Sequence, residues 1–142
     1  MLVIGYGNCL RGDDGVGVVV AQQWSEAGCD AIACHQLTLE LAEPISRADF
    51  VAFVDACIDV PLGMVRTEII EPPEVPANLW THQVDPALLL ALARSWYGHA
   101  PPAVLVGVGG RAFDLCESLS ADIQTALPTI FKILQKFNLL QP

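Results

Sequence analysis

The chain has few positive charges, few charged residues of any kind, and no long apolar run. Its 142 residues include seven Lys and Arg against sixteen Asp and Glu, so the formal net charge is −9. Nucleic acids and anionic membrane surfaces attract clustered cations, and this balance therefore argues against both as partners. The apolar runs fall far short of the roughly 18 residues that a membrane span needs. With 53% hydrophobic residues, the chain can still bury a sizeable core.

The cysteines do not form the pattern of a disulfide framework or of a structural zinc site. There are five of them, an odd number, and no two are separated by two residues. The first five residues carry no basic segment and reach a glycine at once, unlike a signal peptide. We therefore expect a cytoplasmic protein, and the length predicts one domain over residues 1–142.

Short apolar runs alternate with amphipathic stretches along the chain. The patterns predict strands at 2–4, 31–37, 50–54, 64–70 and 103–108, and helices at 14–27, 41–48, 86–97 and from 118 or 120 to 137. The run 50–54 is apolar throughout and ends at Asp55, which is typical of a strand covered on both faces of a parallel sheet. The predicted fold class is α/β, a single three-layer α-β-α domain with a mostly parallel, twisted five-stranded sheet.

In such a sheet, ligands bind beyond the carboxyl ends of the strands, so polar residues that follow strands are the candidates for a site. After the first strand, Gly5-Tyr6-Gly7 starts like a dinucleotide-binding loop, but Leu10 stands where the third glycine is needed. Asp13 and Asp14 follow at a helix start. Capping explains either aspartate, but two exceed what one cap needs, so the second is expected to face the crevice.

Two further polar residues stand near strand ends. Asp55 follows the most apolar strand, where a carboxylate is costly unless it is paired, liganded or solvated, although hydrogen bonds to the next loop also explain it. His82 precedes the helix at 86–97, and a surface position explains it equally well. Together with Asp14, these side chains suit a transition metal such as nickel, zinc, iron or manganese, and the spacing does not choose among them.

A cysteine nucleophile remains open as another reading of the same region. Cys57 lies two residues after Asp55, and Cys34 lies beside His35. For each cysteine, the role of a small buried apolar residue is the favoured explanation.

The motifs resemble those of one known family. The spacing Gly5-x-Gly7-Asn8-x-Leu10-x-x-Asp13-Asp14-Gly15-x-Gly17 is similar to the opening signature of the nickel–iron hydrogenase maturation endopeptidases. Further matches, in the same order, are Phe53-Val54-Asp55-Ala56, Thr81-His82-Gln83-Val84-Asp85-Pro86 and the segment from Phe113 to Ser120. The resemblance thus extends along the whole chain.

This resemblance implies an endopeptidase that removes the C-terminal extension of the hydrogenase large-subunit precursor after nickel has been inserted. It implies that Asp14, Asp55 and His82 bind nickel and carry the reaction. The nickel is expected to be presented by the substrate and not to be permanently bound. We expect substrate contacts from Asn8, Asp13, His35 and Gln36.

One segment departs from the common family pattern, and one functional alternative remains. Many members carry an acidic residue followed by Gly-Gly-Thr or Gly-Thr after the second strand, where this chain has His35-Gln36-Leu37-Thr38. This form resembles the subgroup that serves bidirectional, NAD(P)-coupled hydrogenases. The alternative is a non-catalytic, nickel-recognising chaperone or binding module for the same precursor. It would use the same three residues, so a cleavage assay separates the two.

Overall fold

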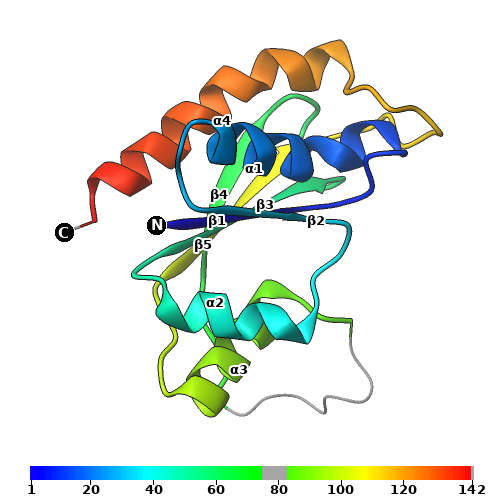
Figure 1. Ribbon diagram of the computed structural model, residues 1–142. Coiled ribbons are helices and arrows are strands. Elements are labelled where there is room, and N and C mark those ends of the chain that lie inside the picture. Colours follow the sequence, from blue (N-terminus) through cyan, green and yellow to red (C-terminus); the bar gives the residue numbers. More distant parts are fainter. Residues whose placement is uncertain (75–82, 142) are drawn as a thin grey trace.

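A five-stranded sheet lies between two layers of helices (Figure 1). The computed structural model describes residues 1–74 and 83–141. In chain order the elements are β1 (Leu2–Tyr6), α1 (Val16–Glu26), β2 (Ala31–Cys34), α2 (Ala42–Arg47), β3 (Val51–Cys57), β4 (Val65–Ile70), α3 (Pro86–Tyr97), β5 (Ala103–Gly109) and α4 (Ala121–Leu139). Short 3₁₀ turns, Gly12–Gly15 and Leu39–Leu41, precede α1 and α2. The element order and the three-layer α/β class are as predicted.

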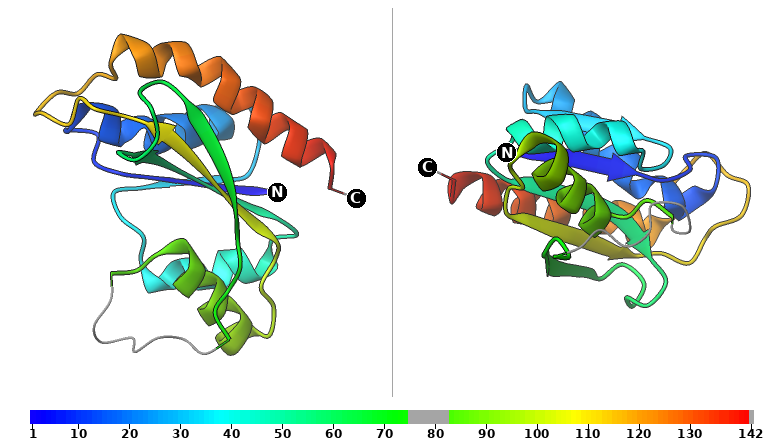
Figure 2. Two further views of the ribbon diagram at one scale, coloured as in Figure 1. Left: turned by 180° about the vertical axis from the view of Figure 1, so that it is seen from behind. Right: turned by 90° about the horizontal axis from the view of Figure 1, so that it is seen from below.

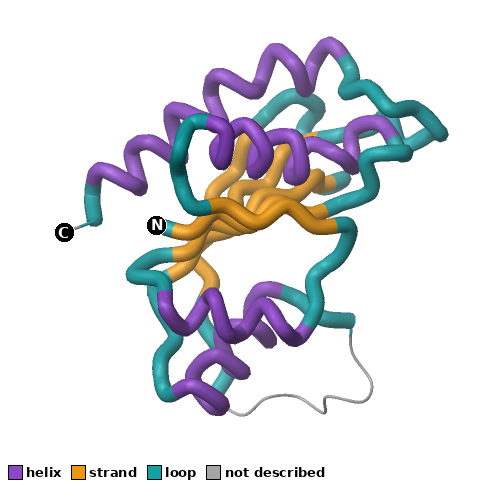
Figure 3. The backbone as a smooth tube through the Cα atoms, viewed as in Figure 1, coloured by secondary structure: helices purple, strands orange, loops and turns teal. Residues whose placement is uncertain are grey.

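The strands lie in the order β2-β1-β3-β5-β4, and only β4 runs antiparallel to its neighbour. Helices α1 and α4 cover one face of the sheet, and α2 and α3 cover the other (Figures 2 and 3). Each face buries its own apolar cluster, because side chains alternate between the two faces along a strand. On β3, for example, Val54 packs under α1 and α4 while Phe53 packs under α2 and α3.

The chain reverses its direction of winding at β1. From β1 it passes through α1 to β2 on one side, and then through α2 to β3 on the other side. The loops that leave the carboxyl ends of β1 and β3 therefore diverge, and a crevice opens between them. In open α/β sheets this topological switch point is where ligands bind. The loop after β1 carries Asp13 and Asp14, and Asp55 lies on β3.

Helix α1 lies directly on the sheet backbone because of Gly17. A Cβ atom at this position would lie 2.2 Å from the Val54 carbonyl oxygen and 2.7 Å from that of Tyr6. No side chain fits there without moving the helix. The glycine therefore brings the start of α1, and the aspartates just before it, close to the ends of β1 and β3.

Local chemistry alone accounts for the bounds of α3. Asp85 Oδ1 accepts a hydrogen bond from the Leu88 N–H at 2.7 Å, and Pro86 occupies the first helical position. Gly98 ends the helix with φ +79°, a left-handed conformation that glycine adopts readily. These bounds are as predicted from the sequence.

Four predicted element ends are wrong. Strand β1 does not end at Ile4 but continues through Gly5 to Tyr6. Strand β3 continues through Asp55 to Cys57, because β5 goes on pairing with it after β1 has ended. Strand β2 ends at Cys34, which pairs with the last residue of β1, so His35 follows the strand and does not lie in it. Helix α1 begins at Val16, after a 3₁₀ turn, and no aspartate side chain caps it.

None of the helices described has the length and apolar character needed to cross a membrane. All five cysteines are free thiols.

Candidate active site

Asp14 is held at the switch point by the loop that follows β1. Its Oδ2 atom accepts a hydrogen bond of 2.7 Å from the Asn8 N–H, which fixes the carboxylate against its own loop. Gly7 makes this turn with φ +140°, and a Cβ atom there would lie 1.9 Å from the Asp14 carbonyl oxygen. The glycine-containing loop after β1 therefore places a carboxylate at the switch point, whereas a phosphate-binding loop would present backbone N–H groups there.

Asp55 lies at the first position of β3 that extends beyond its pairing with β1. The last paired residue is Val54, and the Ala56 N–H donates a 2.8 Å hydrogen bond to Asp55 Oδ1. Burial raises the pKa of Asp55 to about 6; the charge of Asp14 adds to the rise, while the Ala56 N–H and the Tyr6 hydroxyl oppose it. The structure thus brings Asp14 and Asp55, which are 41 positions apart in the chain, close enough to repel each other electrostatically.

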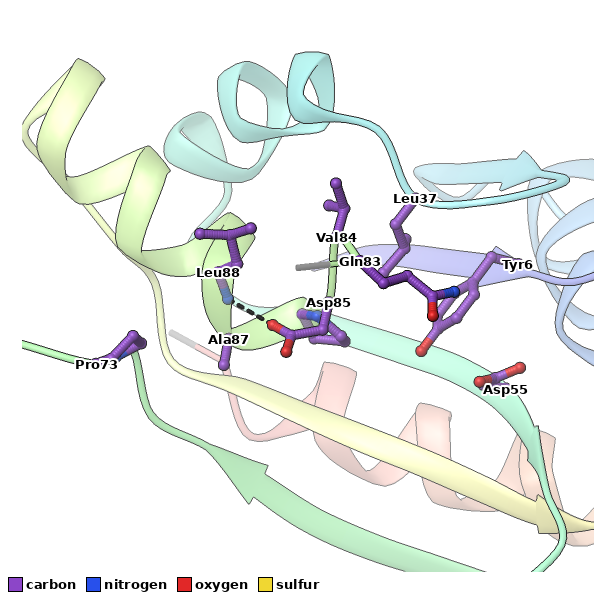
Figure 4. A pocket seen from close by; sticks show the side chains of 10 residues that line it. Tyr6, Leu37, Asp55, Pro73, Gln83, Val84, Asp85, Ala87 and Leu88 are labelled. Carbon is purple, nitrogen blue, oxygen red and sulfur yellow. Dashed lines mark hydrogen bonds between the residues drawn. The ribbon is translucent and has the colours of Figure 1, made fainter. Parts of the chain in front are cut away.

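Tyr6 belongs to the same site, and the sequence analysis did not single it out. Its hydroxyl lies near the Asp55 carboxylate in the close-up (Figure 4). Burial, followed by the charge of Asp55, raises the pKa of Tyr6 far above its ordinary value, so the phenol stays protonated and can donate. A tyrosine between two glycines at the end of a strand was the signal that could have identified it.

Two cavities lie beside this pair of carboxylates. The larger, of about 520 Å³, is lined by Asp55, Tyr6 and Leu37 and by the residues at the start of α3 (Figure 4). The smaller, of about 300 Å³, is lined by Asp14, Arg11, Ala56, Ile58 and Phe113. Each carboxylate therefore faces a space that an extended peptide could enter.

Asp13 has a structural place, since its side chain is fully buried, and its contact with substrate remains a prediction. Oδ1 accepts the Ser120 N–H at 2.8 Å, and Oδ2 accepts the Ser120 hydroxyl at 3.0 Å and the N–H groups of Arg111 and Ala112 at 3.2 Å each. Burial alone would raise the pKa of Asp13, but these hydrogen bonds outweigh it and hold the pKa below its ordinary value. Asp13 thus ties the loop after β5 to the loop after β1.

The other predicted substrate contacts lie near the same edge of the sheet. The Asn8 side-chain oxygen accepts the Leu10 N–H at 2.9 Å, so this amide stabilises its own loop. Asn8 and His35 both line a third cavity, of about 320 Å³, between the loops after β1 and β2. Gln36 is exposed next to it. Their contact with substrate remains a prediction, and His82 lies outside the described residues.

The two cysteines near the site are poor nucleophiles. Burial raises the pKa of the Cys34 thiol, and it raises the pKa of the Cys57 thiol together with the charge of Asp55. A nucleophilic cysteine needs the thiolate form, which both environments disfavour. Carboxylate chemistry is therefore the stronger interpretation of this site. Within residues 1–74 and 83–141, no three His, Cys, Asp or Glu side chains are grouped closely enough to hold a metal ion.

The fold defines the class of protein to which the chain is similar. Solved structures of hydrogenase maturation endopeptidases share it over nearly the whole length of both chains. The resemblance indicated by the sequence motifs is thus confirmed in the fold, while the finer resemblance to one subgroup stays a prediction. No protein-family model and no curated protein matches the sequence.

Three of these structures illustrate the similarity. The hydrogenase 2 maturation peptidase from a Thaumarchaeota archaeon is 26% identical, with a TM-score of 0.71 and coverage of 99% of this chain and 98% of that one. The maturating endopeptidase HybD from E. coli is 24% identical, with a TM-score of 0.71 and coverage of 95% and 91%. The [NiFe] hydrogenase maturation protease HybD from Thermococcus kodakarensis is 20% identical, with a TM-score of 0.73 and coverage of 96% and 97%.

Proposed function

We propose that this protein is an endopeptidase that removes the C-terminal extension of a nickel-loaded hydrogenase large-subunit precursor. The observation that carries the proposal is the pairing of Asp14 and Asp55 at the switch point, with a cavity beside each carboxylate. The opening motif, which resembles that of the maturation endopeptidases, supplies Asp14, and the full-length similarity of fold supports the same activity.

Nickel is part of the substrate in this proposal, already held by ligands of the precursor. Asp14, Asp55 and His82 offer it two carboxylates and an imidazole, which are donors that suit nickel. Binding through the metal would position the scissile bond over the carboxylates, and an empty precursor would lack this anchor. Without nickel the pKa of Asp55 is about 6, and once nickel is bound a carboxylate oxygen that the metal leaves free would accept the proton of the attacking water.

The direct test is mass spectrometry of the precursor after incubation with the protein, with nickel-loaded and nickel-free precursor run side by side. We expect loss of a C-terminal peptide from the loaded precursor only. Asp14→Ala should leave it intact, because one of the two carboxylates is then missing. Cleavage of both forms would contradict the role of nickel. A stable complex without cleavage would favour the binding-module alternative, and no complex at all would exclude this precursor as the substrate.

Exposed apolar side chains stand on the loops that follow β1, β3 and β5, at the same edge of the sheet as the carboxylates, and are available to contact the precursor. We call them the apolar rim, and they are Leu10, Ile58, Leu62, Met64 and Leu115. Hydrogen bonds tie their loops together, from the Cys116 N–H to the Leu10 carbonyl and from the Gly63 N–H to the Gly109 carbonyl, both at 2.9 Å. Apolar side chains gathered beside a site are typical of a protein interface.

Replacing Leu115 with Asp tests this docking surface. We expect the KM for the nickel-loaded precursor to rise about tenfold, the effect of about 1.4 kcal/mol of lost contact, with kcat unchanged. Leu139→Asp is the matched control, because Leu139 is 83% exposed against 89% for Leu115 but lies at the end of α4. Equal effects of the two substitutions would show that the rim has no special role.

A further inference from the structure

Tyr6 is the large side chain between Gly5 and Gly7, and it lies against Asp55. It is the last residue of β1, between Gly5 and Gly7. Its side chain packs beside the apolar cluster under α2 and α3, and it lines the larger cavity together with Asp55 and Leu37. The Tyr6 hydroxyl takes no part in the packing of α1 on the sheet. It also takes no part in the hydrogen bonds of the loop after β1.

The strand register places Tyr6 and Asp55 side by side. Gly5 pairs with Val54, and the next residue on each strand is Tyr6 on β1 and Asp55 on β3. Neighbouring residues of adjacent strands project from the same face of a sheet. In Figure 4 the Tyr6 hydroxyl and the Asp55 carboxylate lie near each other, and both line the larger cavity.

We propose that Tyr6 is a positioning residue, whose hydroxyl donates to the Asp55 carboxylate and holds it in the orientation that the reaction requires. This inference rests on the proposed peptidase function. The terminal torsion of a carboxylate is broad and roughly two-fold, so a single partner does not fix it. The Ala56 N–H already binds Oδ1, and in this proposal the hydroxyl, which lies near the carboxylate in Figure 4, provides a second donor from the neighbouring strand. Two donors from different elements then define the direction in which the remaining lone pairs point.

A partner of this kind affects the rate more than the binding of substrate. Hydrogen-bonding partners of metal-binding or reacting carboxylates typically contribute 10- to 100-fold. The precursor would still be held by the apolar rim and by nickel, so its KM should change little. Phenylalanine fills the same space beside Leu37, and Tyr6→Phe therefore removes the hydroxyl and leaves the packing in place.

The test measures cleavage of the nickel-loaded precursor by wild type, Tyr6→Phe, Asp55→Glu and the double variant, in single-turnover reactions with excess enzyme. We expect Tyr6→Phe to lower the saturating single-turnover rate constant about tenfold, with the half-saturating enzyme concentration within about twofold and an unchanged melting temperature. In the Asp55→Glu background, where the carboxylate is moved by one methylene, the loss caused by Tyr6→Phe should shrink to less than about threefold. Tyr97→Phe is the matched control, because Tyr97 is the other tyrosine of the chain and lies exposed at the end of α3.

Each outcome decides the proposal. A wild-type rate for Tyr6→Phe would overturn it, as would a loss of the same size in both backgrounds, since the hydroxyl would then act independently of Asp55. A lower melting temperature, with the wild-type rate restored on cooling, would assign Tyr6 a purely structural role. Failure of the wild-type protein to cleave the precursor would overturn the proposed function itself, a result distinguishable from all of these.

Discussion

Asp55→Asn should abolish cleavage of the nickel-loaded precursor and at the same time make the protein more stable at neutral pH. Asparagine keeps an oxygen that can accept the Ala56 N–H, so the local structure is preserved. It cannot carry the negative charge or accept a proton from water, and we expect a rate at least about a hundredfold lower, the usual effect of losing a general base. The measurement is the initial rate of loss of the C-terminal peptide.

The gain in stability follows from the raised pKa. Burial raises the pKa of Asp55 to about 6 in the folded protein, against 3.8 ordinarily, so the fold favours the protonated form. Ionisation therefore costs stability progressively from about pH 4, and the full cost applies above about pH 6. The shift corresponds to at most about 3 kcal/mol, and partial access to solvent reduces this to about 1–2 kcal/mol. Melting curves of Asp55→Asn should lie about 4 °C above wild type at pH 7.5 and coincide with wild type near pH 4.

Asp49→Asn is the control for both measurements, since Asp49 is an exposed carboxylate at the opposite edge of the sheet. We expect neither its activity nor its melting temperature to change. If Asp55→Asn cleaved the precursor at the wild-type rate, Asp55 would not take part in the reaction. A melting temperature below that of wild type at pH 7.5 would contradict the conclusion that the ionised Asp55 carboxylate destabilises the fold.

Asp13→Ala should have the opposite profile, with a large loss of stability. The substitution leaves the N–H groups of Arg111, Ala112 and Ser120 without their acceptor, in a place that has no exposed surface. Each unpaired buried group costs roughly 1–3 kcal/mol, and with partial relaxation we expect about 3 kcal/mol in total. For a chain of this length, that lowers the melting temperature by about 10 °C. The measurement is thermal unfolding at pH 7.5.

The neighbouring Asp14→Ala variant provides the comparison. Asp14 accepts one hydrogen bond, at 2.7 Å, and its side chain is partly exposed, so its loss should cost no more than about 1 kcal/mol. We therefore expect the two adjacent aspartates to have different roles, with Asp13 needed for stability and Asp14 needed for cleavage. Equal melting temperatures for the two variants would show that the hydrogen bonds of Asp13 do not stabilise the fold.

Much of the fold could be predicted because its signals are local. The cap at Asp85, the proline after it and the glycine at 98 determine α3 almost without help from the rest of the chain. The apolar run at 50–54 similarly required a strand buried on both faces, and β3 is one. Strand ends were less predictable, since the pairing of Asp55 with Gly107 depends on β5, about fifty residues away.

Some residues of the candidate site could likewise be predicted from the sequence, and others could not. Asp14 and Asp55 could be proposed because they follow strands at the edge of the sheet where ligands bind, although capping and loop hydrogen bonds also offered structural explanations. The position of Tyr6 beside Asp55 could not, because its one local signal, a tyrosine between two glycines at a strand end, does not show which residue of another strand lies next to it. The apolar rim was equally hidden, since it is assembled from loops that follow three different strands.

By itself, the sequence determined the kind of fold, and it predicted the edge of the sheet where a site is expected and the carboxylates proposed to supply its chemistry. These depend on periodicity, capping and residue type, which act over a few positions. Only the tertiary structure decided which of two adjacent aspartates is turned inward and which faces the crevice. Asp13 and Asp14 have the same chemistry, and the difference arises because the N–H groups of a loop a hundred residues away meet one carboxylate and not the other.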